Sequence, residues 1–360
     1  MTIDRKTIEE LAAGGVILGA GGGGSKEMGI KAGLASLEYG EPRMIPIDEL
    51  DDGDVVVTIS GVGSPASKGA YIENSYYNRI IEILTKELGQ KPAALIPSEM
   101  GGSSSFGPFI ASAINGIPIL DAACNGRAHP LGTMGSMGLN ETKGYKTIQV
   151  AMGGDPAEDH LIEMTAKGSV PDTASLVLST AIRAGGLVVV ARNPVPVKYV
   201  REKAAVGCYT HSLEVGRAHM AGKTADEKIR NVADILEGKI LCKGEIRGYR
   251  LETRNGLDVG GFCLSDQKEY SIRFWNEYMA IDSDGERLYT FPDYMMTFDL
   301  ETGEPVTTAN IAEGLKVAVV AAPRSSLILG GGMREASGYR AVEDAVGIPM
   351  LQYVQDLVSK

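Results

Sequence analysis

The feature that most constrains the fold is a change in the pattern of apolar residues near residue 238. Before this point, short runs rich in valine and isoleucine alternate with segments whose apolar residues recur at helical spacing. After it, short strand-like runs follow one another, separated by turn sequences such as Asp282-Ser283-Asp284-Gly285. Alternating strands and helices predict a mostly parallel sheet covered on both faces, whereas consecutive short strands predict an antiparallel barrel or sandwich.

We therefore expect an α/β protein of two domains with a short tail. Residues 1–237 form a three-layer α/β sandwich with a mostly parallel sheet, and they carry the candidate site. Residues 238–335 form a smaller β-rich, barrel-like domain, and residues 336–360 pack back on the first domain. In the first domain we expect helices at residues 6–18, 75–88, 105–115, 156–167, 173–184 and 210–221, and strands at residues 54–60, 93–96, 117–120, 147–151 and 186–191.

The composition limits the compartment and the partners. Of the 360 residues 44% are hydrophobic, and the formal net charge is −11. Nucleic acids and anionic membranes both favour an excess of Lys and Arg, so we expect neither as a partner, and no run of about 18 apolar residues predicts a membrane-spanning helix. The four cysteines form no CxxC pair and the N-terminus has no signal-peptide pattern, so we expect a cytoplasmic protein. Aromatic residues such as Phe274 and Trp275 in the β-rich domain suggest an interface, so we expect a homo-oligomer.

The stretch Asp121–Pro130 carries the densest chemistry and directly follows the apolar run at residues 117–120. A carboxylate, a thiol, an amide, a guanidinium and an imidazole occur within nine residues: Asp121, Cys124, Asn125, Arg127 and His129. Ligands of open α/β sheets bind beyond the carboxyl ends of the strands. This strand end is therefore a candidate site for a small molecule, and the simpler alternative is a polar loop in which Arg127 pairs with Asp121.

The run Gly19-Ala20-Gly21-Gly22-Gly23-Gly24 matches the pattern G-x-G-x-x-G. A dinucleotide fingerprint must follow a strand, whereas this run follows a helical segment and lacks the Gly-Lys-Ser/Thr ending of a phosphate loop. We expect the backbone N–H groups of Gly22, Gly23 and Gly24 to line a polar or anionic ligand. NAD or ATP binding and a turn without any ligand are the alternatives.

Glu99 stands just past the end of the strand expected at residues 93–96, before Gly101 and Gly102. A carboxylate at this place suits a general base, and the neighbouring glycine N–H groups suit the stabilisation of developing negative charge. A carboxylate also stabilises the N-terminus of a following helix. The spacing leaves both roles open.

Cys124 and His129 suit either a nucleophile pair or, together with Asp121, the ligands of a zinc ion. Their spacing is not that of a structural zinc site, and a lone loop cysteine is commonly inert, so a divalent metal is a candidate cofactor only. We expect no other cofactor. A second candidate set of metal ligands comprises Cys208, His211 and His219. The alternative is that these residues lie on a helix surface and have no function.

An ordered series of motifs resembles the S-methyl thiohydantoin desulfurase family, whose members often occur beside hydantoin-metabolising enzymes. The matching stretches are Gly19–Gly24, Pro97–Gly102, Asp121 with Asn125–Pro130, Leu213–Ala218, Glu237–Ile240, Phe274–Glu277, Pro292-Asp293 and Leu300–Gly303. The likeness covers nearly the whole chain, and the ordered set is far more specific than any single motif.

The resemblance implies an N-terminal α/β domain, a smaller β-rich domain that swivels against it, and hydrolytic removal of sulfur from a five-membered thiohydantoin-type ring. It points to Glu99, Asp121, Gly126 and Arg127 as site residues. The loop departs from the family's usual sequence, because two acidic positions are lost and Cys124 and His129 are gained. This departure leaves the substrate and any metal open.

We therefore expect a hydrolase that acts on a small thiohydantoin- or hydantoin-like ring by attack of water, removing sulfur or opening a C–N or C–S bond. Glu99 or Asp121 would be the base, and Arg127 would hold a substrate carboxylate or ring oxygen through two hydrogen bonds. Cys124 would be a nucleophile or a metal ligand. The rival hypothesis is a non-catalytic metabolite-binding or regulatory subunit that works beside a hydantoinase-type enzyme.

Overall fold

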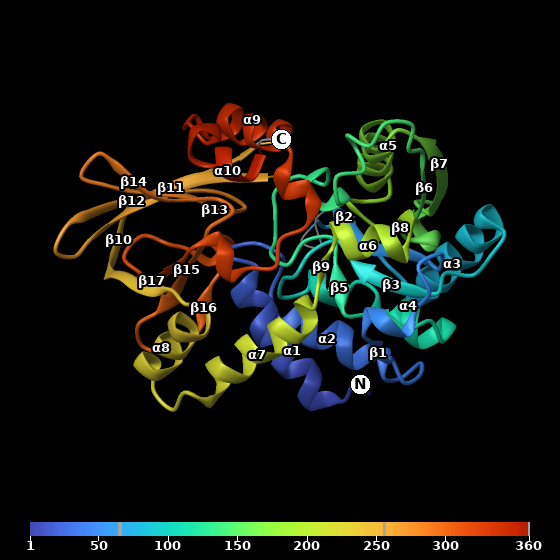
Figure 1. The fold of residues 1–360 in the computed structure, drawn as a ribbon, viewed down its shortest axis with the longest axis horizontal. Helices are drawn as coiled ribbons and strands as arrows, with labels where there is room; N and C mark the ends of the chain where they lie inside the picture. The colour runs from blue at the N-terminus through green and yellow to red at the C-terminus, as the bar shows by residue number, and fades with distance from the viewer. Residues whose placement is uncertain (64–66, 255–256, 359–360) are drawn as a thin grey trace.

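The computed structural model describes residues 1–63, 67–254 and 257–358. Figure 1 shows an α/β part built mainly from the first two thirds of the chain beside a β-rich part built from the last third. The change of texture near residue 238 coincides with the start of the first strand of the β-rich part, β10 (Lys239–Arg254). Among the described residues, no helix has the length and apolar character needed to cross a membrane.

A seven-stranded sheet is the centre of the α/β part. Its order is β1 (Met44–Ile45), β4 (Ile119–Leu120), β3 (Ala94–Pro97), β2 (Val55–Gly63), β8 (Leu187–Pro196), β6 (Thr147–Gly153) and β7 (Ile162–Gly168). The pairs from β1 to β2 are parallel, and the pairs from β2 to β7 are antiparallel. All strands except β8 and β7 thus run in one direction, which confirms the expected α/β class with a mostly parallel sheet.

Helices cover this sheet on two faces. Successive residues of a strand point to opposite faces, so Val189 and Val190 of β8 belong to different cores. Val189 packs with α3 (Asn74–Leu88), which lies near α4 (Phe109–Asn115). Val190 packs with α5 (Val170–Arg183), and α6 (Val197–Lys203) lies on the same face as α5.

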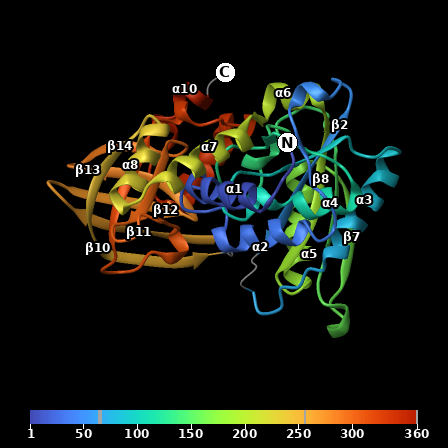
Figure 2. The same cartoon turned by 90° about the horizontal axis from the view of Figure 1, so that it is seen from below.

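Two helices that are far apart in the sequence, α1 (Arg5–Leu18) and α7 (Cys208–Ala221), cross in close contact (Figure 2). A Cβ at Gly14 would lie 1.8 Å from the Ser212 carbonyl oxygen, and a Cβ at Gly216 would lie 2.0 Å from the Glu10 carbonyl oxygen. Only glycine permits this approach of the two backbones. The helix pair is continued by α2 (Lys26–Ser36), which packs on α1, and by α8 (Ala225–Ile235), which packs on α7 and on the β-rich sheet.

The helix expected at residues 156–167 is wrong. This segment contains a single 3₁₀ turn (Pro156–Glu158), followed by the edge strand β7. Ile162 and Met164 alternate with Glu163 and Thr165, and the two apolar side chains pack against the core beneath α5. The period of two is the strand signal, and the polar residues between the apolar ones were misread as the exposed face of a helix.

The β-rich part is one antiparallel sheet that folds over on itself. Its order is β14 (Glu286–Thr290), β13 (Glu277–Ser283), β12 (Glu269–Trp275), β11 (Leu257–Ser265), β10, β17 (Lys316–Ala322), β15 (Tyr294–Asp299) and β16 (Pro305–Val306). The first half of β10 pairs with β17 and the second half with β11. The two halves face each other, because the Tyr278 hydroxyl on β13 is hydrogen-bonded to the Thr297 hydroxyl on β15 at 2.7 Å. In the described part of the chain β14 and β16 remain edges, so this barrel-like unit is an open, folded sheet.

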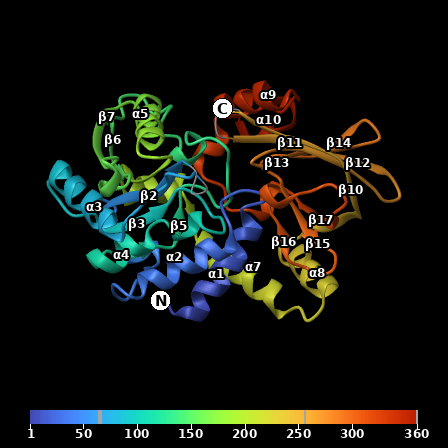
Figure 3. The same cartoon turned by 180° about the vertical axis from the view of Figure 1, so that it is seen from behind.

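The C-terminal segment lies mainly on the β-rich sheet, although we expected it on the first domain. Helix α9 (Ala336–Val346) packs against β11 and β12, and α10 (Gln355–Val358) follows it, as Figures 1 and 3 show. The Tyr339 ring lies 6.1 Å from the Phe291 ring. The start of α9 also contacts the first domain, where the Ser337 hydroxyl donates to Glu141.

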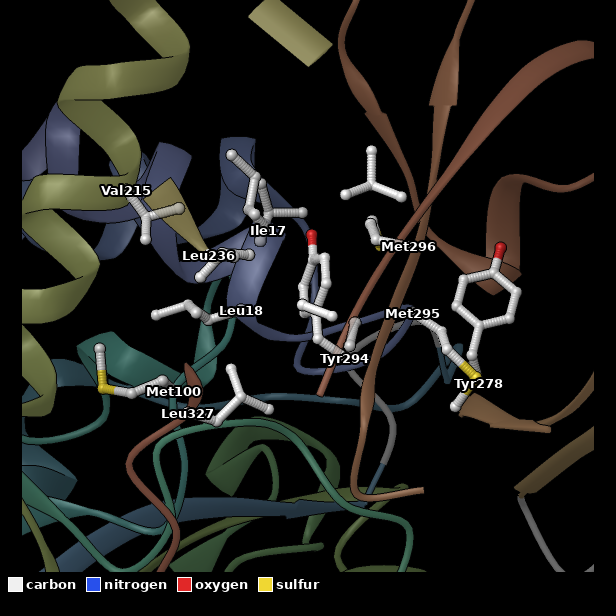
Figure 4. Close-up of a cluster of buried hydrophobic side chains, with 14 of the residues drawn as sticks. Ile17, Leu18, Met100, Val215, Leu236, Tyr278, Tyr294, Met295, Met296 and Leu327 are labelled. Atoms are coloured by element: carbon white, nitrogen blue, oxygen red, sulfur yellow. The ribbon is translucent and has the colours of Figure 1, made fainter. Parts of the chain in front are cut away.

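One hydrophobic core continues from the α/β part into the β-rich part. Figure 4 shows Tyr294 of β15 and Leu327 beside Ile17 and Leu18 of α1 and Met100, which follows β3. All except Leu327 are essentially inaccessible to solvent. The loops that follow the central strands therefore lie at a packed boundary between the two parts, and this boundary holds most of the predicted site residues.

Candidate active site

Glu99 lies directly beyond the carboxyl end of β3, the position at which α/β sheets bind ligands. Its side chain is 13% exposed. Oε2 accepts a hydrogen bond of 3.1 Å from the backbone N–H of His129. Oε1 makes no hydrogen bond with any described residue, so one oxygen is fixed and the other is free to accept a proton.

The His129 side chain lies against Glu99, with Nε2 at 3.3 Å from Oε2. This contact lacks hydrogen-bond geometry, and neither ring nitrogen has a partner among the described residues. Burial lowers the pKa of His129, and the nearby Glu99 carboxylate offsets this effect only in part. Gly135 leaves room for the ring, since a Cβ there would lie 2.6 Å from Nε2. The structure thus brings Glu99 and the His129 ring, two of the candidate catalytic residues, into contact.

Cys124 is buried beneath this loop, with Sγ at 3.2 Å from the Thr58 hydroxyl. Burial raises the pKa of the thiol to about 11, more than its hydrogen bond to Thr58 lowers it. A thiol is nucleophilic as the thiolate, so this environment opposes nucleophilic catalysis. Arg192 and Glu99 are its charged neighbours.

Asp121 is engaged at the start of α7. Oδ1 accepts from the backbone N–H groups of Tyr209 at 2.9 Å and Thr210 at 3.2 Å, and Oδ2 accepts from the Thr210 hydroxyl at 2.6 Å. These N–H groups belong to the first turn of the helix and have no partner within the helix. Asp121 therefore caps α7 from a distant part of the sequence. Close by, β5 (Ala122–Ala123) pairs with β9 (Ala205–Val206), which leads into the helix.

The candidate zinc ligands do not form a common binding site. Among the described residues, no group of three or more His, Cys, Asp and Glu side chains is placed to hold a metal ion. Asp121 caps α7, whereas Cys124 is hydrogen-bonded to Thr58. In the second candidate set, Nε2 of His219 lies 2.8 Å from the Gly303 carbonyl oxygen. These donor sets do not fit a zinc ion, and we derive no step through one.

Arg127 is completely buried and joins its loop to the β-rich part. Its guanidinium donates to the carbonyl oxygens of Pro292 at 3.0 Å and Asp293 at 2.7 Å, and it lies over the Phe291 ring at 4.5 Å. Burial lowers its pKa to about 10, and Glu277 is the first of the acidic neighbours that oppose this shift. The alternative in which Arg127 pairs with Asp121 is wrong, since Asp121 faces α7.

Asn125 and Gly126 fix the same loop against residues 328–330. The Asn125 amide donates to the Arg127 carbonyl oxygen at 2.8 Å and accepts from the Gly330 N–H at 3.0 Å. The N–H of Gly126 donates to the Ile328 carbonyl oxygen, and a Cβ at Gly126 would lie 2.1 Å from that oxygen. In this structure both residues therefore position the loop.

The two glycine-rich loops pack against each other. The Gly23 carbonyl oxygen accepts from the N–H groups of Ser103 and Ser104, and a Cβ at Gly101 would lie 2.5 Å from the Gly23 Cα atom. Gly23 and Gly24 have positive φ angles of 74° and 79°, which favour glycine.

The donors of these loops are only partly used. The N–H of Gly22 donates to the carbonyl oxygen of Gly19, and the N–H of Gly101 donates to the Ser105 hydroxyl. The N–H groups of Gly23, Gly24 and Gly102 make no hydrogen bond with any described residue. As predicted, a helix precedes the first of these loops and not the strand that a dinucleotide site requires.

Glu277 is a site residue that the sequence analysis quoted within a motif but gave no role. It begins β13, is 2% exposed, and its Oε2 has no partner among the described residues. A Cβ at Gly22 would lie 1.8 Å from its Oε1, so the first glycine loop rests on this carboxyl group. Burial and the nearby Glu99 raise the pKa of Glu277 well above its usual range, and Arg127 opposes them.

Arg192 is a second residue near the candidate site that the sequence analysis missed, with Cys124 and Glu99 as ionisable neighbours. It lies on β8 in the centre of the sheet, directly opposite Thr58 of β2. The signal was weak, because Arg192 directly follows the apolar run Leu187–Ala191, where the expected strand ended, whereas β8 continues to Pro196. A charged residue inside a buried strand needs a specific reason to be there.

The fold and the site define a two-part α/β and β protein with a carboxylate and an imidazole at the boundary of its parts. Two family models match the chain, the S-Me-THD-like N-terminal domain at residues 6–159 and the S-Me-THD-like C-terminal domain at residues 171–340. The chain belongs to the S-Me-THD-like family, which confirms the resemblance found in its motifs. The junction of the two models falls within the α/β part, ahead of α5, and not at the start of β10.

One solved structure supports the fold. The crystal structure of a protein from Chromobacterium violaceum has a TM-score of 0.70 with this chain, at 20% sequence identity and over 96% of each chain. At this identity the likeness shows a shared fold only. No curated protein matches the sequence.

Proposed function

We propose that this protein is a hydrolase that removes sulfur from a small thiohydantoin-type ring. The observation that carries the proposal is the state of Glu99, whose Oε2 is held by the His129 N–H while its Oε1 is free. A carboxylate fixed through one oxygen suits a general base that acts through the other. Membership of the S-Me-THD-like family supports the thiohydantoin class of substrate.

The reaction is written for an S-methyl thiohydantoin, in which the ring carbon between the two nitrogens carries the S-methyl group. Oε1 of Glu99 accepts a proton from water while the water oxygen bonds to this carbon and the electron pair of the ring C=N bond moves onto nitrogen. The carbon–sulfur bond then breaks with its electron pair on sulfur, and the proton held by Glu99 passes to sulfur and completes methanethiol. The remaining proton of the added hydroxyl moves to the ring nitrogen. The ring carbon keeps the oxygen as a carbonyl group, so the second product is a hydantoin.

Negative charge develops on the ring during the attack and requires donors that are already in place. The N–H groups of Gly23, Gly24 and Gly102 supply donors without acceptors of their own. Glu277 is a second proton carrier, because burial favours its neutral form and its Oε2 is unpartnered. Of the four carboxylate, thiol and imidazole candidates, we assign proton transfer to Glu99 and its positioning to His129, with Asp121 and Cys124 as supports.

Substrate entry requires movement in this proposal. A groove of about 310 Å³ opens between the start of α7 and residues 325–328, and its lining includes His211 and Ile328 but not Glu99. Glu99 lies beneath the boundary where Arg127 ties its loop to the β-rich part. We infer that the β-rich part swivels to admit the ring and closes to exclude water, in line with the family resemblance.

The experiment is the release of methanethiol from an S-methyl thiohydantoin by the wild type and by Glu99→Gln. The variant keeps the size of the side chain and should lower kcat by a factor of about 10² to 10⁴ with little change in KM. Glu163→Gln, which alters an exposed carboxylate on β7 paired with Arg79, is the matched control and should turn over normally. Full activity of Glu99→Gln contradicts the assignment, and binding without any turnover by the wild type favours the non-catalytic rival.

A further inference from the structure

Arg192 places a permanent charge in the middle of the seven-stranded sheet. Its strand, β8, lies between β2 and β6, and Arg192 pairs with Thr58 on one side and Gln149 on the other. Residues directly opposite each other in a sheet project to the same face, so Arg192 shares the face of Thr58, whose hydroxyl contacts Cys124. This face underlies the loop that carries His129.

The guanidinium has no partner of its own. Arg192 is 7% exposed, and its Nε atom makes no hydrogen bond. Within the described ranges no carboxylate comes within 4.0 Å of it, and no other hydrogen bond engages its side chain. Burial lowers the pKa of Arg192, and its acidic neighbours Cys124 and Glu99 offset this effect only in part. An unpaired buried charge is strongly unfavourable, so such a group is expected to meet an anion.

Two neighbouring residues share this lack of partners. The Ser60 hydroxyl is buried without a hydrogen-bond partner among the described residues. Ser60 lies two residues beyond Thr58 on the same strand, and hence on the same face as Arg192. Both ring nitrogens of His129 also lack a hydrogen-bond partner among the described residues. The charge of Arg192 contributes to lowering the pKa of His129. Arg192 therefore has two neighbours with unpartnered polar atoms, Ser60 on the same face of the sheet and His129 within the range of its charge.

We propose that Arg192, together with Ser60 and His129, binds an anionic group of the ring substrate. This inference rests on the proposed function and identifies the substrate as one that enters the site as an anion. A guanidinium matches a planar anion with two acceptor atoms, and such an anion is either a carboxylate on the ring substituent or the ionised ring amide. Arg127 is less suited to this role, because its Nη1 and Nε donate to backbone carbonyl oxygens and the acidic side chains of Glu277 and Asp293 lie near it, although its Nη2 also lacks a partner among the described residues.

The test is calorimetric binding of two probes, hydantoin-5-acetate and the uncharged analogue 5-ethylhydantoin, to the wild type and to Arg192→Met. Loss of a charged hydrogen-bonding group should weaken binding of the anion about 10- to 100-fold. Preference for hydantoin-5-acetate at neutral pH assigns the carboxylate as the anion. Binding of 5-ethylhydantoin that strengthens as its ring N–H ionises assigns the ring amide.

A stability measurement separates a binding role from a structural one. Replacement of an uncompensated buried charge by an apolar side chain is neutral or stabilising, so Arg192→Met should melt at the wild-type temperature or above it. The matched control is Arg287→Met, which removes a buried arginine that is paired with Asp282 at 2.6 Å. This control should melt at a lower temperature and keep probe binding.

The outcomes distinguish this inference from the proposed function. Wild-type affinity of Arg192→Met for both probes, or no binding of either probe by the wild type, overturns the anion site. If those results were obtained but Glu99→Gln still lost turnover, the proposed hydrolase would stand, and its substrate would not bind as an anion. Arg192-dependent binding in a protein that turns over no thiohydantoin would keep the anion site and reject the hydrolase.

Discussion

Oε2 of Glu99 accepts a hydrogen bond from the backbone N–H of His129 and lies 3.3 Å from Nε2 of the same residue. The two residues are 30 positions apart and come from the loops that follow β3 and β4. Parallel strands bring their carboxyl ends to one edge of the sheet, so the fold itself creates this contact. The contact fixes one oxygen of the carboxylate and leaves the other available for proton transfer.

Burial of the His129 ring makes stability dependent on pH, and the contact with Glu99 opposes this effect only in part. The folded pKa of His129 is lowered by burial, whereas an unfolded histidine titrates near 6.5. The unfolded state therefore binds more protons as the pH falls below about 6.5, and the free energy of unfolding decreases over that range. Urea unfolding at a series of pH values from about 7 to about 5 should show a shallower decrease for His129→Gln than for the wild type. Identical slopes would contradict the burial of a neutral ring. The same comparison of slopes is made for His219→Gln, because His219 is a second buried histidine with a lowered pKa.

Glu277 should have the opposite dependence. Its folded pKa lies well above that of an unfolded glutamate, mainly because of burial, so the folded state binds more protons. The stability that this proton contributes is complete below about pH 4.3 and is lost as the pH rises through the folded pKa. Glu277→Gln mimics the protonated form. The difference between its melting temperature and that of the wild type should therefore shift in favour of the variant as the pH rises from about 5 to about 8. A growing loss over that range would indicate an ion pair with Arg127.

Asp121 should act through the stability of α7. Loss of its carboxylate leaves the N–H groups of Tyr209 and Thr210 without their acceptor. Asp121→Ala should lower the free energy of unfolding by about 1–2 kcal/mol in urea, whereas Asp121→Asn should retain most of it, since asparagine also caps helices. Asp121→Asn with normal stability and no turnover would instead make Asp121 the base.

The cysteines should differ in reactivity. Cys124, Cys208 and Cys242 are buried, and Cys263 is partly exposed. Burial raises the pKa of Cys124 to about 11 and that of Cys242 to about 12, so both remain thiols at neutral pH. Titration with a disulfide reagent should detect one fast thiol in the native protein and four after unfolding. A fast-reacting Cys124, identified by peptide mapping, would restore it as a candidate nucleophile.

The sequence was sufficient for the class of fold and for the placement of some candidate residues at one edge of the sheet. Short β-branched runs and helical spacing predicted β2, β3 and α3, because their local patterns agree with their burial. Strand β7 was misassigned because its alternation is confined to a few residues at the edge of the sheet. The position of Glu99 and His129 beyond consecutive parallel strands was predictable, since strand direction determines where loops meet.

The remaining features depend on contacts between distant segments. Arg127 was expected to bind substrate, and the structure directs its Nη1 to the carbonyl oxygens of Pro292 and Asp293 in the β-rich part. Glu277 reaches the site only because that part packs on the first glycine loop. No local pattern encodes either contact. The swivelling of the two parts stays a prediction.

The central claim is tested most directly by carrying out the reaction of an S-methyl thiohydantoin in ¹⁸O-labelled water and analysing both products by mass spectrometry. Attack of water on the ring carbon predicts one ¹⁸O atom in the hydantoin and one methanethiol per turnover, with both lost in Glu99→Gln. Unlabelled hydantoin, or an unchanged substrate after prolonged incubation with the wild type, would contradict the account.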